Sequence, residues 1–133
     1  MVSRRTVLLY SPHFVAPEHR SGPTYRATPP LSHLALAGPL REAGYQVQIV
    51  DAKWDTDWRS LVRQNHDRLL CAGITSLTGP AVSDGLEFAT FTKQLRPDLP
   101  LIGGAGTRAL RPSKPWKTAG RYCRARDGRA DLC

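Results

Sequence analysis

Small polar residues and glycines gather where buried apolar runs end, and these are the residues best suited to hold a ligand. Ser76 and Thr78 alternate along an extended segment, so both hydroxyls can point to one side, and Gly79 leaves room beside them. Gly103 and Gly104 follow another apolar run and let a flat or bulky molecule approach the backbone. A capping pair before a helix and a glycine turn without a ligand remain open as alternatives.

The cysteines do not have the spacing of a metal or disulfide site. Cys71, Cys123 and Cys133 are an odd count, widely separated along the chain. Cys71 lies inside an apolar run, where we expect it to behave as a small buried hydrophobe. The sequence therefore predicts no zinc site and no iron–sulfur cluster.

Four short apolar runs predict the strands of a parallel sheet. They lie near residues 6–10, 46–51, 69–75 and 99–102. Helical patterns alternate with them, which is typical of an α/β, doubly wound parallel sheet of the Rossmann-like or flavodoxin-like type. We expect the first strand to lie between the second and the third. Mostly buried positions should be Leu9, Val50, Cys71, Ile74, Leu86, Phe88 and Ile102.

The predicted helices have clear ends and one internal conflict. They span residues 31–43, 55–64 and from Pro80 to just before Pro97, the last with Asp84 and Glu87 on its outer side. The first has Ser32 as a candidate N-cap and an expected buried face of Leu36, Leu40 and Ala43. Pro39 inside it removes a backbone hydrogen bond, so we expect a kink or a break there.

Ligands of such sheets bind outside the carboxyl ends of the strands. These ends are the loop 11–30, the turn 51–55, the segment 75–79 and the pair 103–104. Asp51 and the loop 11–30 therefore lie at the rim of the predicted site.

The net charge of +8 comes almost entirely from the end of the chain. Residues 105–133 hold 8 Lys and Arg against 2 Asp and Glu, whereas residues 1–104 hold 11 against 9. Residues 1–104 are nearly neutral and lack the broad basic face that binds a phosphate backbone, so no nucleic-acid partner is expected. No apolar run reaches the roughly 18 residues of a membrane span, and the sequence favours a cytoplasmic protein.

Five motifs together resemble one known family. They are Pro29-Pro30-Leu31, Leu40-Arg41-Glu42-Ala43-Gly44-Tyr45, Val50-Asp51-Ala52, Gly73-Ile74-Thr75-Ser76-Leu77-Thr78-Gly79 and Leu101-Ile102-Gly103-Gly104. In this pattern, residues 5–104 resemble the N-terminal cobalamin-binding domain of cobalamin-dependent radical SAM enzymes. The resemblance implies a domain 1–104 that holds a corrinoid, the cofactor cobalamin, at its strand ends.

The resemblance also assigns roles to residues. By analogy, Ser76, Thr78 and Gly79 would contact the nucleotide tail of the corrinoid, and Gly103 and Gly104 would let the tail lie along the sheet. The wider superfamily often carries an Asp-x-His-x-x-Gly motif whose histidine binds cobalt, and this sequence has none. His13, His19 and His33 lie near the right region without that spacing, and a lone loop histidine is expected to be solvated rather than a metal ligand.

The catalytic half of that family has no counterpart here. Its chemistry needs a Cys-x-x-x-Cys-x-x-Cys loop that holds an iron–sulfur cluster, and no such loop occurs in this sequence. The chain is therefore expected to be a cofactor-holding module without catalytic residues, separated from its radical SAM partner domain.

Two other functions remain as alternatives. One is a regulatory or interaction domain of flavodoxin-like fold without a cofactor, which the near neutrality of residues 1–104 permits. The glycine-rich stretch 103–108 also resembles the nucleotide-binding signature of sugar-nucleotide pyrophosphorylases. In that family the signature follows the first strand, whereas here it follows the fourth, which makes this the remote alternative.

Residues 105–133 are expected to be a basic, poorly ordered tail that arose by frame shift. With permitted codons, the frame starting at the third base of Gly104 reads Gly-Trp-His-Ala and then Pro-Glu-Gln-Thr-Leu-Glu-Asp, as in the resembling proteins. A second frame, starting inside Gly120, reads Val-Asp-Ile-Val-Val-Arg-Gly-Thr-Gly-Glu. The fold is then incomplete at the C-terminus, with an exposed sheet edge. A genuine basic tail for nucleic acid or a membrane surface is the alternative.

Overall fold

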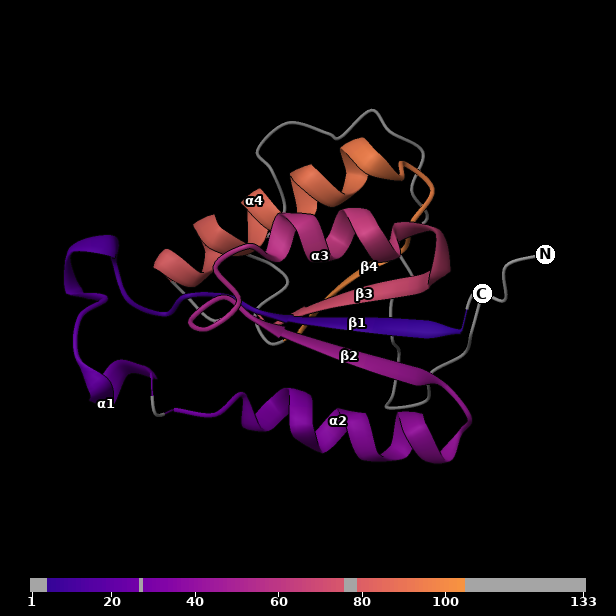
Figure 1. Cartoon of the computed structure of the whole chain (residues 1–133), viewed down its shortest axis with the longest axis horizontal. Coiled ribbons are helices and arrows are strands. Elements are labelled where there is room, and N and C mark those ends of the chain that lie inside the picture. Colours follow the sequence, from indigo (N-terminus) through magenta and orange to yellow (C-terminus); the bar gives the residue numbers. More distant parts are fainter. Residues whose placement is uncertain (1–4, 27, 76–78, 105–133) are drawn as a thin grey trace.

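A computed structural model describes residues 5–26, 28–75 and 79–104. Four parallel strands form one sheet in the order β2-β1-β3-β4, which confirms the predicted fold class and the position of the first strand (Figure 1). The strands are β1 (Thr6–Ser11), β2 (Gln46–Asp51), β3 (Leu69–Thr75) and β4 (Leu101–Gly104).

The fourth strand begins two residues later than predicted. Leu99 is fully buried but belongs to a turn, in which its N–H donates to the Arg96 carbonyl at 3.1 Å. The ladder to β3 starts where the Pro100 carbonyl accepts from the Ala72 N–H at 3.0 Å. Hydrophobicity therefore marks Leu99 as core, whereas the turn decides that it is not in the strand.

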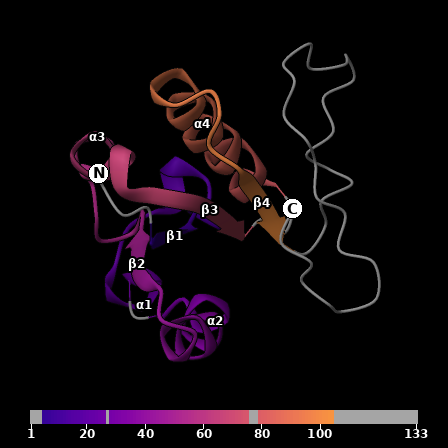
Figure 2. The same cartoon turned by 90° about the vertical axis from the view of Figure 1, so that its right-hand side faces the viewer.

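Helices cover the two faces of the sheet unequally (Figure 1). On one face lies α2 (Leu31–Glu42), beneath β2 and β1, and on the other lie α3 (Trp58–Asn65) and α4 (Pro80–Leu95). Short helical turns are η1 (Pro17–His19), α1 (Pro23–Arg26) and η2 (His66–Arg68). Figure 2 shows α2 below β2 and well apart from β4, so the α2 face of the sheet is only partly covered by described residues.

The main core lies between the sheet and the pair α3 and α4. Tyr10 stacks on Phe88 with ring centroids 4.1 Å apart and meets Trp58 edge-on at 5.5 Å. Strand side chains alternate between faces, so Leu8 and Val50 join this cluster on the same face. Interlocked aromatic rings fix how α3 and α4 sit over the sheet and hence where their first turns lie.

The predicted core is confirmed for Leu9, Val50, Ile74 and Phe88. Cys71 is half-buried rather than buried, and burial raises the pKa of its thiol.

Two of the predicted core positions, Leu86 and Ile102, are wrong. Leu86 is 38% exposed because α4 turns Ala81, Gly85 and Phe88 toward the sheet instead. Ile102 is 57% exposed because it pairs with Gly73 on the face that α2 leaves partly uncovered.

The helix α2 also differs from its prediction. It is continuous through Pro39, so the expected break is absent, and the N-cap is Pro30, without a side-chain cap, rather than Ser32. Its one buried residue is His33, whereas Leu36 and Ala43 of the expected face are exposed. The helix is apolar on several sides, so periodicity alone selects the wrong face.

None of the helices in the described part of the chain is long and apolar enough to cross a membrane. The domain boundary expected at residue 104, and the tail 105–133, lie beyond what the structure describes.

Candidate functional site: the carboxyl edge of the sheet

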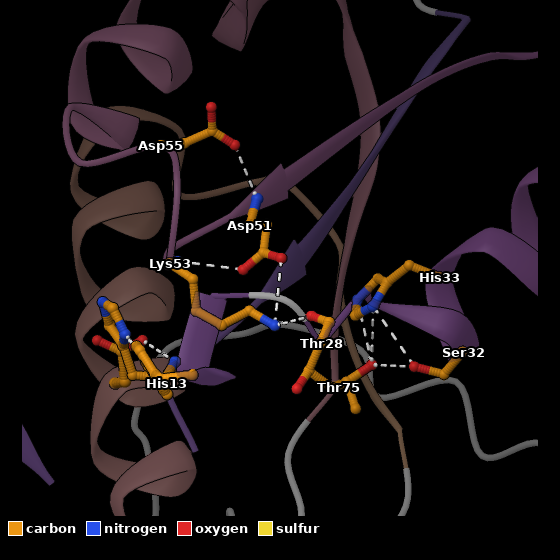
Figure 3. Close-up of polar contacts among 10 residues, drawn as sticks. His13, Thr28, Ser32, His33, Asp51, Lys53, Asp55 and Thr75 are labelled. Atoms are coloured by element: carbon orange, nitrogen blue, oxygen red, sulfur yellow. Dashed lines mark hydrogen bonds and ion pairs between the residues drawn. The ribbon is translucent and has the colours of Figure 1, made fainter. Parts of the chain in front are cut away.

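A row of small and polar residues crosses the carboxyl ends of the strands. Ser11 pairs with Asp51, and Thr75 pairs with Gly104. Because Tyr10 precedes Ser11 and points to the α3 and α4 side, alternation turns Ser11 toward the α2 side. Asp51 and Thr75 also meet partners from the α2 side, so this row faces the first turn of α2 and the loop before it (Figure 3).

Asp51 organises the turn after β2. Its Oδ1 accepts from the Lys53 N–H at 3.1 Å, and its own N–H donates to Asp55 Oδ2 at 2.8 Å. The Lys53 ammonium lies 3.5 Å from Asp51 Oδ2 and donates to the Thr28 carbonyl (Figure 3). The turn 51–55 is therefore joined to the loop that leads into α2.

His33 joins α2 to the end of β3. Its Nε2 lies 3.1 Å from Thr75 Oγ1, and Ser32 Oγ lies 3.4 Å from the same hydroxyl (Figure 3). Burial lowers the pKa of His33, opposed by a backbone hydrogen bond at Tyr10 and by the charge of Asp51. The expectation that this histidine is solvated is wrong, because α2 packs with this side toward the sheet and the ring meets Thr75 at the end of β3.

Two buried oxygens in this row are unsatisfied. In the described part of the chain, Ser11 Oγ has no hydrogen-bond partner, and Asp51 Oδ2 has none besides its ion pair with the Lys53 ammonium at 3.5 Å. Buried polar atoms in native proteins are usually paired with protein, water or ligand. The row therefore has unused capacity for a molecule that carries hydrogen-bond donors.

The sequence-predicted site residues come from three strand ends. Gly79 stands directly before α4 with φ +62°, and an added Cβ there would meet nothing within 4 Å. Gly103 and Gly104 lie in β4 beside Ile74 and Thr75. Ser76 and Thr78 lie outside the described residues.

The structure brings Asp51 to the same edge as Gly79 and the glycine pair, though two strands lie between Asp51 and Gly104. Sequence reasoning missed Lys53 and placed His33 wrongly. Lys53 could have been found from its spacing to Asp51, because the two residues lie on either side of a turn. The contact of His33 leaves no local signal in the sequence, because its partner Thr75 is 42 residues away. No group of three or more His, Cys, Asp or Glu suited to a metal ion occurs among the described residues.

Comparison with known proteins gives similarity to solved structures alone. No family model and no curated protein matches the chain. The radical S-adenosylmethionine methyltransferase TsrM from Kitasatospora setae, solved with its tryptophan substrate and a SAM analogue, matches at a TM-score of 0.58 and 22% identity. The same enzyme with cobalamin and a [4Fe-4S] cluster bound matches at 0.57 and 23%.

The similarity shows a shared fold. It covers 76% of this chain but 19% and 18% of the two TsrM chains, so the chain spans about a fifth of their length. The chain thus shares its α/β architecture, including the parallel sheet, with a part of the TsrM structures.

Proposed function

We propose that this chain is a corrinoid-binding module of the radical SAM type, which holds cobalamin at the carboxyl edge of its sheet. The unpartnered oxygen of Ser11, together with Asp51 Oδ2, which has an ion pair but no hydrogen bond, supports the proposal most directly. Amide side chains and a ribose give a corrinoid many N–H and O–H donors, and such donors would satisfy both oxygens. The TsrM structure with bound cobalamin adds support at the level of the fold.

The glycines of the edge fit the same ligand. Gly79 has open space beside it, and the pair Gly103 and Gly104 offers bare backbone at the end of β4. Ser76 and Thr78 complete the proposed contact to the nucleotide tail. Cobalamin, when bound, would supply the methyl-transfer or radical chemistry of a partner domain, while this chain binds and orients it.

Titration with hydroxocobalamin tests the proposal. We expect a change in the corrinoid absorbance spectrum and a coloured protein peak on gel filtration. Gly103→Val should abolish both, because a branched side chain would occupy the bare backbone surface. Gly38→Ala is the matched control, since it adds a methyl group in open space on α2 and should bind as the parent does.

Circular dichroism of the parent and both variants establishes that each is folded. A folded parent protein with no spectral change and no retained colour would refute corrinoid binding. Equal binding by Gly103→Val and the parent would remove the glycine pair from the site.

An interaction domain without cofactor is the second candidate function. The observation that favours it is that Leu31 and Leu34, one helical turn apart on α2, are both exposed. Exposed apolar patches of this kind often mark protein interaction sites. A colourless protein that has no affinity for hydroxocobalamin would favour this function.

We also propose that residues 105–133 are a frame-shifted segment of the parent gene, and that the radical SAM domain is encoded further on. The alternate frames of the gene should contain the motifs given above, and a Cys-x-x-x-Cys-x-x-Cys loop should follow downstream.

A further inference from the structure

A hollow lies on the α3 and α4 side of the sheet edge, next to the first turn of α3 and the second turn of α4. It has a volume of about 310 Å³, which is the size of a small-molecule site. Its walls come from the loop after β1, the turn after β2 and both helices. The residues on which its chemistry depends are His13, Arg20, Tyr25, Arg59, Asp84 and Glu87.

The acidic side chains of this hollow are already engaged. Asp84 Oδ2 accepts from the Tyr10 hydroxyl at 3.1 Å and from the His13 N–H at 2.8 Å. Glu87 forms an ion pair with Arg59. Arg59 thus neutralises the charge of Glu87, whereas Asp84 keeps its charge and serves to hold Tyr10 and the His13 backbone in place.

Arg20 is the cation that retains binding capacity. Its Nε donates to the Val15 carbonyl at 2.8 Å, which orients the guanidinium. No acidic side chain of residues 5–26, 28–75 and 79–104 forms an ion pair with Arg20. An oriented guanidinium with free N–H groups is the side chain best suited to a planar or tetrahedral oxyanion.

Aromatic rings beside Arg20 close the hollow. His13 and Tyr25 stack with ring centroids 6.0 Å apart, and His13 Nδ1 is hydrogen-bonded to the Tyr25 hydroxyl. Burial, and then the charge of Arg20, lower the pKa of His13, so its ring is neutral at neutral pH. The rings therefore add a wall that carries no charge beside the guanidinium of Arg20.

We propose that this hollow is a binding site for a small molecule bearing a phosphate or carboxylate group, held by the guanidinium of Arg20. The site lies on the α3 and α4 side of the edge, whereas the Ser11 and Asp51 oxygens face α2. Lys53 lines this hollow and also pairs with Asp51, so the two sites adjoin. The contacts are still separate, because the anion is held by Arg20, which is not among the proposed corrinoid contacts.

Calorimetric titration in a buffer free of phosphate tests the site, with inorganic phosphate and citrate as separate probes. We expect at least one of them to bind to the parent protein, and the stronger one to identify the preferred oxyanion. Arg20→Gln should weaken that binding by roughly tenfold or more, because the charge and the paired N–H groups are both lost. Arg20→Lys should bind with intermediate affinity, because it keeps the charge alone.

Arg41→Gln is the matched control, since it removes the same charge from the exposed end of α2 and should leave the affinity unchanged. Circular dichroism shows whether each variant is folded. Failure of both probes to bind the folded parent, or equal loss in Arg20→Gln and Arg41→Gln, would overturn the proposal.

Hydroxocobalamin titration of Arg20→Gln separates the two sites. Unchanged corrinoid binding, together with loss of the anion, is the expected result. If the parent binds the anion but never a corrinoid, the proposed function fails and this site stands. Loss of both ligands in Arg20→Gln would show one shared site and contradict the separation proposed here.

Discussion

Lys53 and His33 show how single residues at this edge are held by partners distant in sequence. The Lys53 side chain is almost fully buried, and a buried ammonium group is costly unless a charge and hydrogen bonds compensate it. Asp51 supplies the charge and the Thr28 carbonyl an acceptor. The turn after β2 and the entry to α2 are therefore energetically coupled, although 25 residues separate Lys53 from Thr28.

The burial of His33 predicts a dependence of stability on pH. Its pKa in the folded protein is lowered from the ordinary value of 6.5, so the folded state resists protonation more than the unfolded state does. The free energy of unfolding should therefore have its highest value, as far as His33 is concerned, above pH 6.5. It should fall as the pH drops below 6.5 and through the pKa of the folded state. Urea unfolding at pH 7.5 and 5.5 measures this loss.

His33→Gln should reduce the loss between the two pH values, because a side chain that does not titrate replaces the buried ring. His13 also has a lowered pKa, so part of the loss should persist. His19→Gln, at an exposed position of η1, serves as the control and should leave the loss unchanged. The same loss in His33→Gln as in the parent would contradict the assignment.

At the scale of elements, α2 is the least typical helix of the structure. It contains Pro39, lacks a side-chain N-cap and buries His33 alone. The proline leaves the Ala35 carbonyl without its normal helical donor, but Ala35 and Pro39 are both exposed, so water can replace that hydrogen bond. This exposure explains why the helix continues where the sequence predicts a break.

Pro39→Ala should stabilise the protein by about 2 kcal/mol. Alanine restores the backbone donor and is the better helix former, and this gain exceeds the entropy that proline removes from the unfolded chain. Urea unfolding checks the prediction, and Gly38→Ala controls for general helix stabilisation at the neighbouring position. A free energy of unfolding equal to or below that of the parent would show that Pro39 is accommodated without cost.

At the scale of the whole molecule, the two faces of the sheet are not equally covered. The helices α3 and α4 cover one face, whereas α2 covers the β2 and β1 part of the other (Figure 1). Strands of a parallel sheet are normally buried on both faces. The exposure of Ile102 on β4 follows from this partial cover.

Ile102→Lys should reduce self-association of the purified protein. A charge on an outer strand opposes edge-to-edge pairing, and the change removes an apolar side chain that is already 57% exposed. Sedimentation velocity over a range of concentrations measures the effect. Gln64→Lys adds the same charge at an exposed position of α3 and should change the association much less. Equal association in the parent and in Ile102→Lys would show that self-association does not involve the β4 edge.

Composition and periodicity predict the kind and order of the four strands and the three long helices. Runs such as Thr6–Tyr10 and Gln46–Asp51 have the apolar, β-branched composition of buried strands, and Pro80 marks the start of α4. The handedness of crossover connections then fixed β1 between β2 and β3. It also placed Asp51, Gly79, Gly103 and Gly104 at one edge, because parallel strands end on the same side.

Tertiary structure alone decided which side chains meet and which faces are covered. Asp84 was expected on the outside of its helix but accepts hydrogen bonds from Tyr10 and His13, which are 74 and 71 residues away. Periodicity reports that a helix has an apolar side, but burial depends on which neighbouring layer lies against it. For this reason Ile102 and Leu86 read as core in the sequence, yet they are exposed where no described element covers them.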